Sequence, residues 1–182
     1  MIGSTTMLRL RKPTEIDLAA IKAAYARSAL VHSHWACPPE DYSVYLRERN
    51  RYFLCLSARD DIVGTFNISG VIRGRFQSAY LGYEVFYPYQ RKGYMSQGMQ
   101  LLLAEAFGPL NLHRLEANIQ PDNAASIRLV KNAGFTKEGY SRAYLNVGGK
   151  GWKDHERWAI VNPHWRPEHQ TELVNFELTQ IA

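Results

Sequence analysis

The hydrophobic period of the chain changes near Gly93, and this change restricts the possible folds more than any other feature. Residues 52–57, 62–71 and 79–86 are apolar-rich segments separated by polar or glycine-flanked turns, which predicts three consecutive strands. Short turns between consecutive strands favour an antiparallel meander. A helical face follows in residues 93–107, with apolar side chains at Met95, Met99, Leu102, Leu103 and Ala106.

A fifth strand is predicted at residues 113–119, where Leu115, Ala117 and Ile119 alternate. The unit from residue 79 to residue 119 is then strand, helix, strand. Such crossovers are right-handed, and this one makes the fourth and fifth strands parallel.

The two ends of the chain add further strands and helices. Residues 8–11 predict a first strand, Thr14-Glu15-Ile16-Asp17 predicts a capping box, and residues 40–50 predict a second helix. The capping box opens a helix whose inner face carries Leu18, Ile21 and Tyr25. Residues 123–133 predict a last helix, and residues 135–147 and 152–161 a final hairpin.

We therefore expect one α/β domain of the α+β kind over residues 1–182, with its core at about residues 8–165 and a polar tail at 166–182. Its central sheet is mixed and mostly antiparallel, with helices on both faces. A length of 182 residues and a hydrophobic fraction of 46% suit one domain with a substantial core.

Composition excludes several classes of protein. No apolar run reaches the roughly 20 residues of a membrane-spanning helix, and the first residues lack a secretory signal pattern. Two cysteines, Cys37 and Cys55, cannot build a disulfide framework, so a reducing cytoplasm is the expected compartment. We predict no metal site and no direct nucleic-acid binding, because neither metal-ligand spacing nor an RNA-stacking pattern is present.

Gln90-Arg91-Lys92-Gly93-Tyr94-Met95 lies between the fourth strand and the following helix. The first N–H groups of a helix have no intrahelical partner, and with the helix dipole they attract anions such as a pyrophosphate. Gly93 permits close approach of the backbone, while Arg91 and Lys92 add cationic donors. The alternative is an ordinary exposed helix start with two solvated charges.

This hexapeptide resembles the acetyl-CoA motif of GNAT acetyltransferases. A second GNAT-like segment runs from Asn118 to Ser126 and continues through Lys131-Asn132-Ala133-Gly134-Phe135. With supporting stretches elsewhere, residues 8–165 resemble most closely the ribosomal-protein N-terminal acetyltransferases of the RimJ/RimL type. The resemblance implies a GNAT fold with acetyl-CoA as the acyl donor.

The resemblance also implies which residues hold the cofactor. The fourth and fifth strands would splay and accept the pantetheine arm beside the backbone of Glu84, Val85 and Phe86. The pyrophosphate would lie on Gln90, Arg91, Lys92, Gly93, Tyr94 and Met95, with Asn118, Asn123 and Ser126 further along the same site. Met95 departs from the usual Gly or Ala, and we expect its side chain in the core, with its N–H left for phosphate.

The expected chemistry is direct attack of an amine on the thioester, which requires a base and an acid. Ser126 is the first candidate acid, with Tyr140 and Tyr144 as others; alternatively Ser126 caps or packs its helix. The resemblance implies a base on the strand after Gly134-Phe135, but Ala143 occupies the matching position.

Glu84 is therefore the candidate base, against the alternative of a solvated strand residue. Glu116 and His155 are weaker candidates, and His113 is expected to be structural. A covalent route through Cys37 or Cys55 is disfavoured because neither lies in a GNAT-like segment.

The aromatic residues allow two interpretations. Trp35, Tyr42 and Tyr45 either form an acceptor groove or pack the early helices, whereas Trp152 and Trp158 are expected in the core. The predicted acceptor is a protein N-terminal α-amine. A small amine such as a polyamine, aminoglycoside or amino-acid derivative is the alternative, and a non-catalytic acyl-CoA-binding module is a third. Whether the protein is a monomer or a homodimer stays open.

Overall fold

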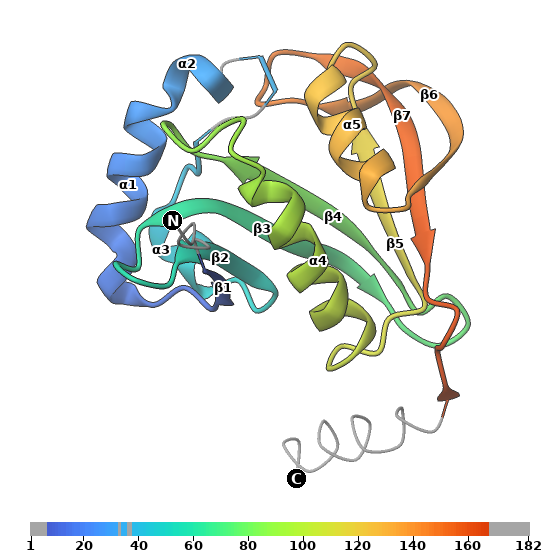
Figure 1. Cartoon of the computed structure of the whole chain (residues 1–182). Helices are drawn as coiled ribbons and strands as arrows, with labels where there is room; N and C mark the ends of the chain where they lie inside the picture. Colours follow the sequence, from blue (N-terminus) through green and yellow to red (C-terminus); the bar gives the residue numbers. More distant parts are fainter. Residues whose placement is uncertain (1–6, 33, 36–37, 168–182) are drawn as a thin grey trace, which may run out of the picture.

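A seven-stranded sheet crosses the molecule in the order β1-β2-β3-β4-β5-β7-β6 (Figure 1). The computed structural model describes residues 7–32, 34–35 and 38–167. The strands are β1 Leu8–Arg11, β2 Arg51–Leu56, β3 Ile62–Ile72, β4 Ser78–Val85, β5 Arg114–Ile119, β6 Thr136–Asn146 and β7 Trp152–Val161. The helices are the 3₁₀ helix η1 Glu15–Asp17, then α1 Leu18–Arg27, α2 Ala29–His32, α3 Tyr42–Arg47, α4 Tyr94–Phe107 and α5 Ala124–Asn132.

The β4–β5 pair is the parallel one, as the crossover through α4 requires. Neighbouring strands elsewhere in the sheet run antiparallel. The β4–β5 ladder is short: it joins Ser78 to Arg114 and ends with the pair Tyr80 and Glu116. Beyond that pair the two strands separate, which confirms both the mixed sheet and the predicted splay.

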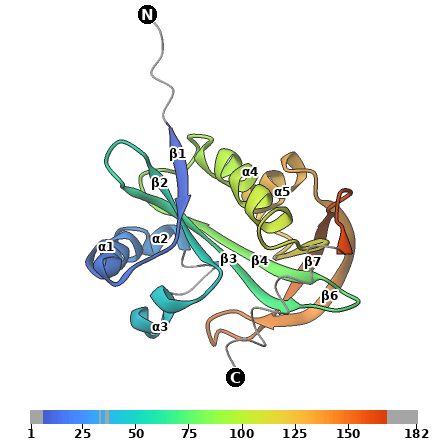
Figure 2. The same ribbon diagram turned by 90° about the horizontal axis from the view of Figure 1, so that it is seen from below.

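Helices cover both faces of the sheet, with α1, α2 and α3 on one side and α4 and α5 on the other (Figure 2). Side chains alternate along each strand, so β2 supplies both layers. Leu54 packs with Met99 and Val130 under α4 and α5, whereas Phe53 and Cys55 pack with Ile21 and Tyr45 under α1 and α3.

Three local expectations need correction. The helix predicted for residues 40–50 is the shorter α3: the Asp41 side chain caps its start by accepting from the N–H groups of Ser43 and Val44, and the backbone of Glu48, with ψ of 121°, is no longer helical. Helix α2 was not predicted, since four residues carry no readable period. Trp158 is buried as expected, but Trp152 lies at the hairpin end and its side chain is 66% exposed.

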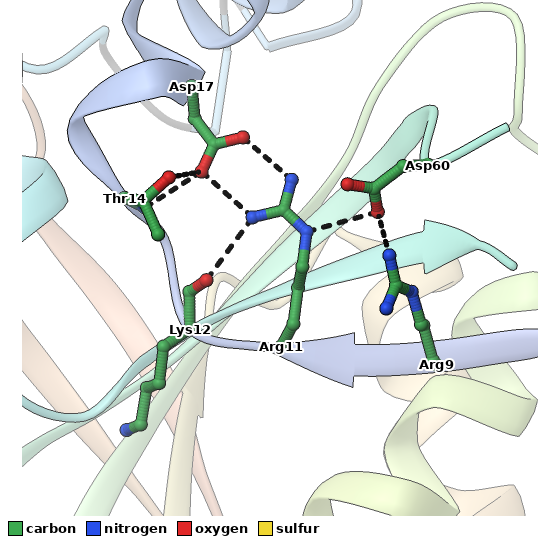
Figure 3. Close-up of polar contacts among 6 residues, drawn as sticks. All are labelled: Arg9, Arg11, Lys12, Thr14, Asp17 and Asp60. Carbon is green, nitrogen blue, oxygen red and sulfur yellow. Dashed lines mark hydrogen bonds and ion pairs between the residues drawn. The ribbon is translucent and has the colours of Figure 1, made fainter.

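An ion-pair group, here called the Arg11 cluster, joins β1 to η1 and to the β2–β3 turn (Figure 3). It consists of Arg9, Arg11, Thr14, Asp17 and Asp60. The guanidinium of Arg11 donates to both oxygens of Asp17, at 2.8 and 2.6 Å, and its Nε donates to Asp60 at 3.0 Å. Asp60 also pairs with Arg9 at 2.9 Å.

The predicted capping box lies within this cluster, because the N–H of Thr14 donates to Asp17 Oδ2 at 2.7 Å. Burial opposes ionisation of Asp17, but the hydrogen bonds from Arg11 and Thr14 outweigh it and lower the pKa of that carboxyl. In the part of the chain that the structure describes, no helix combines the length and apolarity needed to cross a bilayer.

Candidate active site

A cleft of about 900 Å³ opens where β4 and β5 separate. Its walls come from α2, the outer half of β4, the loop leading into α4, β5 and the start of α5. The sequence-predicted residues that line it are Glu84, Val85, Gln90, Arg91, Lys92, Gly93, Tyr94, Met95, Asn118, Asn123 and Ser126. The stretches 84–95 and 118–126, which the sequence predicted as the site, thus meet at one cleft together with α2.

The loop before α4 has the backbone geometry of an open helix start. Gly93 is the N-cap in the left-handed region, with φ of 75°, and no side chain caps the helix. A Cβ at this position would meet no atom within 4 Å, so the backbone borders free space. The side chain of Met95 packs against the α4–α5 core, as predicted for this position.

At the end of β4, the backbone N–H and C=O groups of successive residues point alternately to β3 and to the cleft. The N–H of Phe86 donates to the Val63 carbonyl at 2.8 Å, and Phe86 is fully buried in the α1–α3 core. Because ladder bonds alternate in an antiparallel pair, Glu84 and Phe86 turn their backbone groups to β3, and Tyr83 and Val85 turn theirs to the cleft. The expectation that Phe86 faces the cofactor is therefore wrong.

Ser126 meets a residue that sequence reasoning missed. Its Oγ lies 2.5 Å from the hydroxyl of Tyr83, across the cleft from α5 to β4. The cap of α5 is instead the side chain of Asn123, which accepts from the Ser126 N–H at 3.1 Å. Ser126 is thus free of the capping role. Burial raises the pKa of Tyr83 to about 12, although the Ser126 bond lowers it.

Strand alternation could have placed Tyr83 on the face of β4 opposite to Glu84. Its ring packs with Phe66, on the face covered by α4 and α5, and the neighbouring Glu84 therefore points to the opposite face. No residue-type signal marks Tyr83 as functional, because a strand tyrosine is ordinary core.

Glu84 is largely buried beneath α1 and α2, with a side chain that is 22% exposed, and so differs from the solvated strand residue of the alternative. Its Oε1 accepts from the Tyr25 hydroxyl at 3.2 Å, and its Oε2 lies 3.4 Å from Nδ1 of His32. Burial raises the pKa of Glu84, against the lowering influence of His32, Tyr25 and Arg51. His32 was missed because it lies on the unpredicted helix α2.

Asn118 contributes an unsatisfied acceptor to the cleft. Its Oδ1 is buried and has no hydrogen-bond partner among the described residues, although the residue lines the cleft wall. Buried polar atoms without partners are rare in folded proteins and indicate a ligand or water contact. This atom fits a ligand that carries an N–H or O–H donor.

Several predicted site residues lie elsewhere. Tyr140 stands exposed on β6, donates to Asp154 at 2.6 Å and does not line the cleft. The reason is the edge position of β6, which β7 separates from β5. Glu116 accepts from Arg114 at 2.9 Å, and the ring of His113 packs edge-on against Trp165; neither residue lines the cleft.

The remaining candidates divide between core and cleft. His155 lines the cleft, with Nδ1 2.9 Å from the Lys153 carbonyl. Cys55 is fully buried, and burial raises its pKa to about 12, which suits a core thiol. Cys37 lies outside the described residues.

The aromatic residues divide between the cleft and the helix packing: Trp35 lines the cleft, while Tyr42 and Tyr45 pack around Tyr25. Among the described residues no group of His, Cys, Asp and Glu side chains has the arrangement of a metal site.

Comparison with known proteins agrees with this geometry. A family model described as an acetyltransferase (GNAT) domain matches residues 7–136. The ribosomal protein uS5-alanine N-acetyltransferase of Escherichia coli strain K12 is 37% identical over 107 residues, which cover 59% of this chain and 55% of that protein. The chain thus spans about half the length of that curated relative.

Two solved structures extend the similarity to nearly the whole described fold. The ribosomal-protein-S5-alanine acetyltransferase from Vibrio fischeri superposes with a TM-score of 0.77 at 25% identity, covering 88% of this chain and 96% of that one. RimJ of Mycobacterium smegmatis, in complex with CoA-disulfide, has a TM-score of 0.69 at 26% identity, with 85% and 81% covered. The family model matches well over half of the residues, and the chain belongs to the GNAT acetyltransferase family.

Proposed function

We propose that this protein transfers an acetyl group from acetyl-CoA to a protein N-terminal α-amine. The observation that carries the proposal is the arrangement of proton-transfer groups at the splay. The hydroxyls of Tyr83 and Ser126 lie on the α4–α5 face of β4, and the carboxyl of Glu84 lies on the α1–α3 face. A candidate acid and a candidate base therefore line the same cleft, which supports acylation of an amine.

The residues present suit a CoA-type ligand. The first-turn N–H groups of α4, with Arg91 and Lys92, would hold the pyrophosphate. The backbone groups of Tyr83 and the N–H of Val85 would pair with the pantetheine amides, as a strand edge pairs with an added chain. When bound, acetyl-CoA supplies the thioester carbonyl that the amine attacks.

Proton movements are assigned to three side chains. Glu84 accepts the proton that the amine loses, and burial, which raises its pKa, suits a carboxyl to that task near neutral pH. On the opposite face, Ser126 Oγ would donate a proton to the departing thiolate, and the Tyr83 hydroxyl, 2.5 Å away, would pass its own proton to Ser126 and regain one from solvent. Direct transfer needs no covalent protein intermediate.

The charge of the cleft supports a singly charged acceptor. Of the described residues that line it, Glu84 is the acidic one, while Arg91, Lys92 and Arg128 are basic. A polyamine carries several positive charges and calls for several carboxylates, whereas an N-terminal amine needs one. The similar proteins named for ribosomal-protein alanine acetylation point to an N-terminus that begins with alanine.

A thiol-release assay across peptides tests the proposal. Peptides that begin with Ala, Ser or Met are compared with spermidine, an aminoglycoside and the same peptides carrying a blocked N-terminus. We expect turnover with free α-amines, none with blocked peptides, and a product acetylated at its first residue by mass spectrometry. Turnover confined to small amines would replace the acceptor class, and binding of acetyl-CoA without any turnover would identify a non-catalytic module.

A further inference from the structure

His32 bridges the cleft edge and the buried carboxyl. Its Nε2 lies 2.8 Å from the carbonyl oxygen of Val85. A carbonyl accepts and cannot donate, so Nε2 must carry a proton in this contact. The other nitrogen, Nδ1, is then an acceptor in the neutral ring and a donor in the protonated ring. The Val85 carbonyl thereby selects one tautomer.

Nδ1 of His32 and Oε2 of Glu84 face one another at 3.4 Å. Both atoms are buried, and neither has a hydrogen-bond partner among the described residues. The other carboxyl oxygen already accepts from Tyr25 at 3.2 Å. With a neutral ring and an ionised carboxyl, two lone pairs are directed at the same gap, an arrangement that a single added proton relieves.

The groups around this gap come from every neighbouring element. Glu84 faces His32 on α2, Tyr25 on α1, and Tyr42 and Tyr45 on α3. Arg51 of β2 is more distant. It is linked to Tyr25 by hydrogen bonds that run through Tyr45 and Thr65. Tyr25 and the other tyrosines donate or pack, and burial raises their pKa, so they do not compete for the proton near neutral pH.

We propose that His32 and Glu84 form a one-proton site in the cleft wall, in which His32 is a positioning residue for the base. The site receives one proton from the ammonium form of the acceptor. The N–H bond breaks, its electron pair stays on the acceptor nitrogen, and the proton is held between Oε2 and Nδ1. Charge balances, since the carboxylate and the ammonium neutralise each other in the step. The role in catalysis rests on the proposed function, but the shared proton does not.

The tautomer of His32 and the proton that it shares with Glu84 can be tested without measuring acetyl transfer. ¹⁵N-histidine NMR of the wild-type protein, with the His32 signals assigned by their absence in His32→Gln, reports both ring nitrogens. We expect Nε2 to stay protonated and Nδ1 to change with pH. In Glu84→Gln the pH response of Nδ1 should differ from that in the wild-type protein, because interacting sites bind protons together. A deprotonated Nε2, or identical titrations in the two proteins, would overturn the proposal.

Kinetics test the role in catalysis. Gln at position 32 still offers an amide donor to the Val85 carbonyl but has no titratable nitrogen. We expect His32→Gln and Glu84→Gln each to lower kcat about 100-fold or more, with KM for acetyl-CoA within about twofold. The double variant should be no slower than the slower single variant, because the two residues act as one unit. His164→Gln, at an exposed position outside the cleft, is the matched control.

The outcomes separate this inference from the proposed function. Additive losses in the double variant, with an active wild-type protein, would overturn the shared site and leave the acetyltransferase assignment standing. A wild-type protein that acetylates no amine, with coupled NMR titrations, would remove the proposed function and keep the shared proton. If Glu84→Gln does not fold, Tyr25→Phe perturbs the same carboxyl through its Oε1 contact, and an unchanged His32 titration in that variant would also contradict the proposal.

Discussion

The Arg11 cluster and the His32–Glu84 pair are two charged groups against the same core, and they are built in opposite ways. Arg11 lies over the ring of Phe53, at one end of the α1–α3 core, and its donors reach both oxygens of Asp17 and one of Asp60. At the other end, Glu84 has one hydrogen-bonded oxygen, while Oε2 and the facing Nδ1 of His32 have no hydrogen-bond partner.

The difference separates a structural polar group from a functional one. In the satisfied cluster the pKa of Asp17 is lowered, so the folded protein favours the charged carboxyl. In the unsatisfied pair burial raises the pKa of Glu84, so ionisation costs folding free energy. A carboxyl that the fold holds at such a cost, beside a cleft, is a candidate for chemistry.

The largest expected effect is on activity, in Glu84→Gln. Loss of a general base should lower kcat/KM about 100- to 1,000-fold. The thermal midpoint at pH 7.5 should not fall, because the amide keeps the Tyr25 contact and removes a buried charge. Activity within about threefold of wild type, measured in a folded variant by circular dichroism, would place Glu84 outside the mechanism.

The same carboxyl sets the direction of the pH dependence. The pKa of Glu84 is raised above its ordinary 4.5, and the base works when ionised. Activity should therefore decline as the pH falls through a value above 4.5, and this acid limb should be absent in Glu84→Gln. A wild-type limb at or below 4.5 would contradict the burial argument.

Asp17→Asn should show the reverse pattern, with lost stability and retained activity. Removing one partner of a largely buried pair costs about 3 kcal/mol, while kcat/KM should stay within about twofold. The pKa of Asp17 is lowered from 3.8, so its contribution is complete above pH 3.8 and disappears as the pH falls through the lower folded value.

Urea unfolding at pH 7 and at pH 3 measures this dependence, and the difference between variant and wild type should shrink at the lower pH. Asp61→Asn breaks a more exposed pair with Arg59 and serves as the control, with an expected change of about 0.5 kcal/mol. Equal losses in the two variants would show that the Arg11 cluster stabilises the fold no more than an exposed ion pair does.

A smaller effect is expected at the hydroxyl pair on the other face. Tyr83→Phe keeps the ring packing and removes the hydroxyl that contacts Ser126, so kcat should fall about tenfold. Because the pKa of Tyr83 is about 12, the loss should be the same at every pH from about 6 to 9. A loss that varies across this range would assign the titrating acid to another group.

The smallest effect is expected for Tyr25→Phe, which removes one neutral donor from Glu84. A hydrogen bond to a charged group contributes about 1.5 to 3 kcal/mol, but the carboxyl accepts this bond both before and after it takes the proton, so kcat/KM should change about fivefold or less. A loss as large as that of Glu84→Gln would mean that Tyr25 itself moves the proton, and the catalytic site would then include α1.

Local sequence patterns predicted most elements, and they failed where tertiary position decides. Strand alternation located β7 at residues 152–161 without error, and the Gln90–Met95 loop was recognised from its place before a helix. Tyr140 was misassigned because its strand lies at the sheet edge, beyond β7. Phe86 was misassigned because ladder parity, which depends on register with β3, turns its N–H inward.

The sequence by itself determined the order of strands and helices, the crossover between β4 and β5, and the glycine at the start of α4, because these follow from side-chain period and backbone freedom within short windows. Only the tertiary structure brought His32 to Glu84 and Tyr83 to Ser126, pairs 52 and 43 positions apart. Their contacts depend on where α2 and α5 pack on the two faces of β4. No local pattern encodes the distance between residues that far apart, so the proton-transfer groups became visible only in the folded chain.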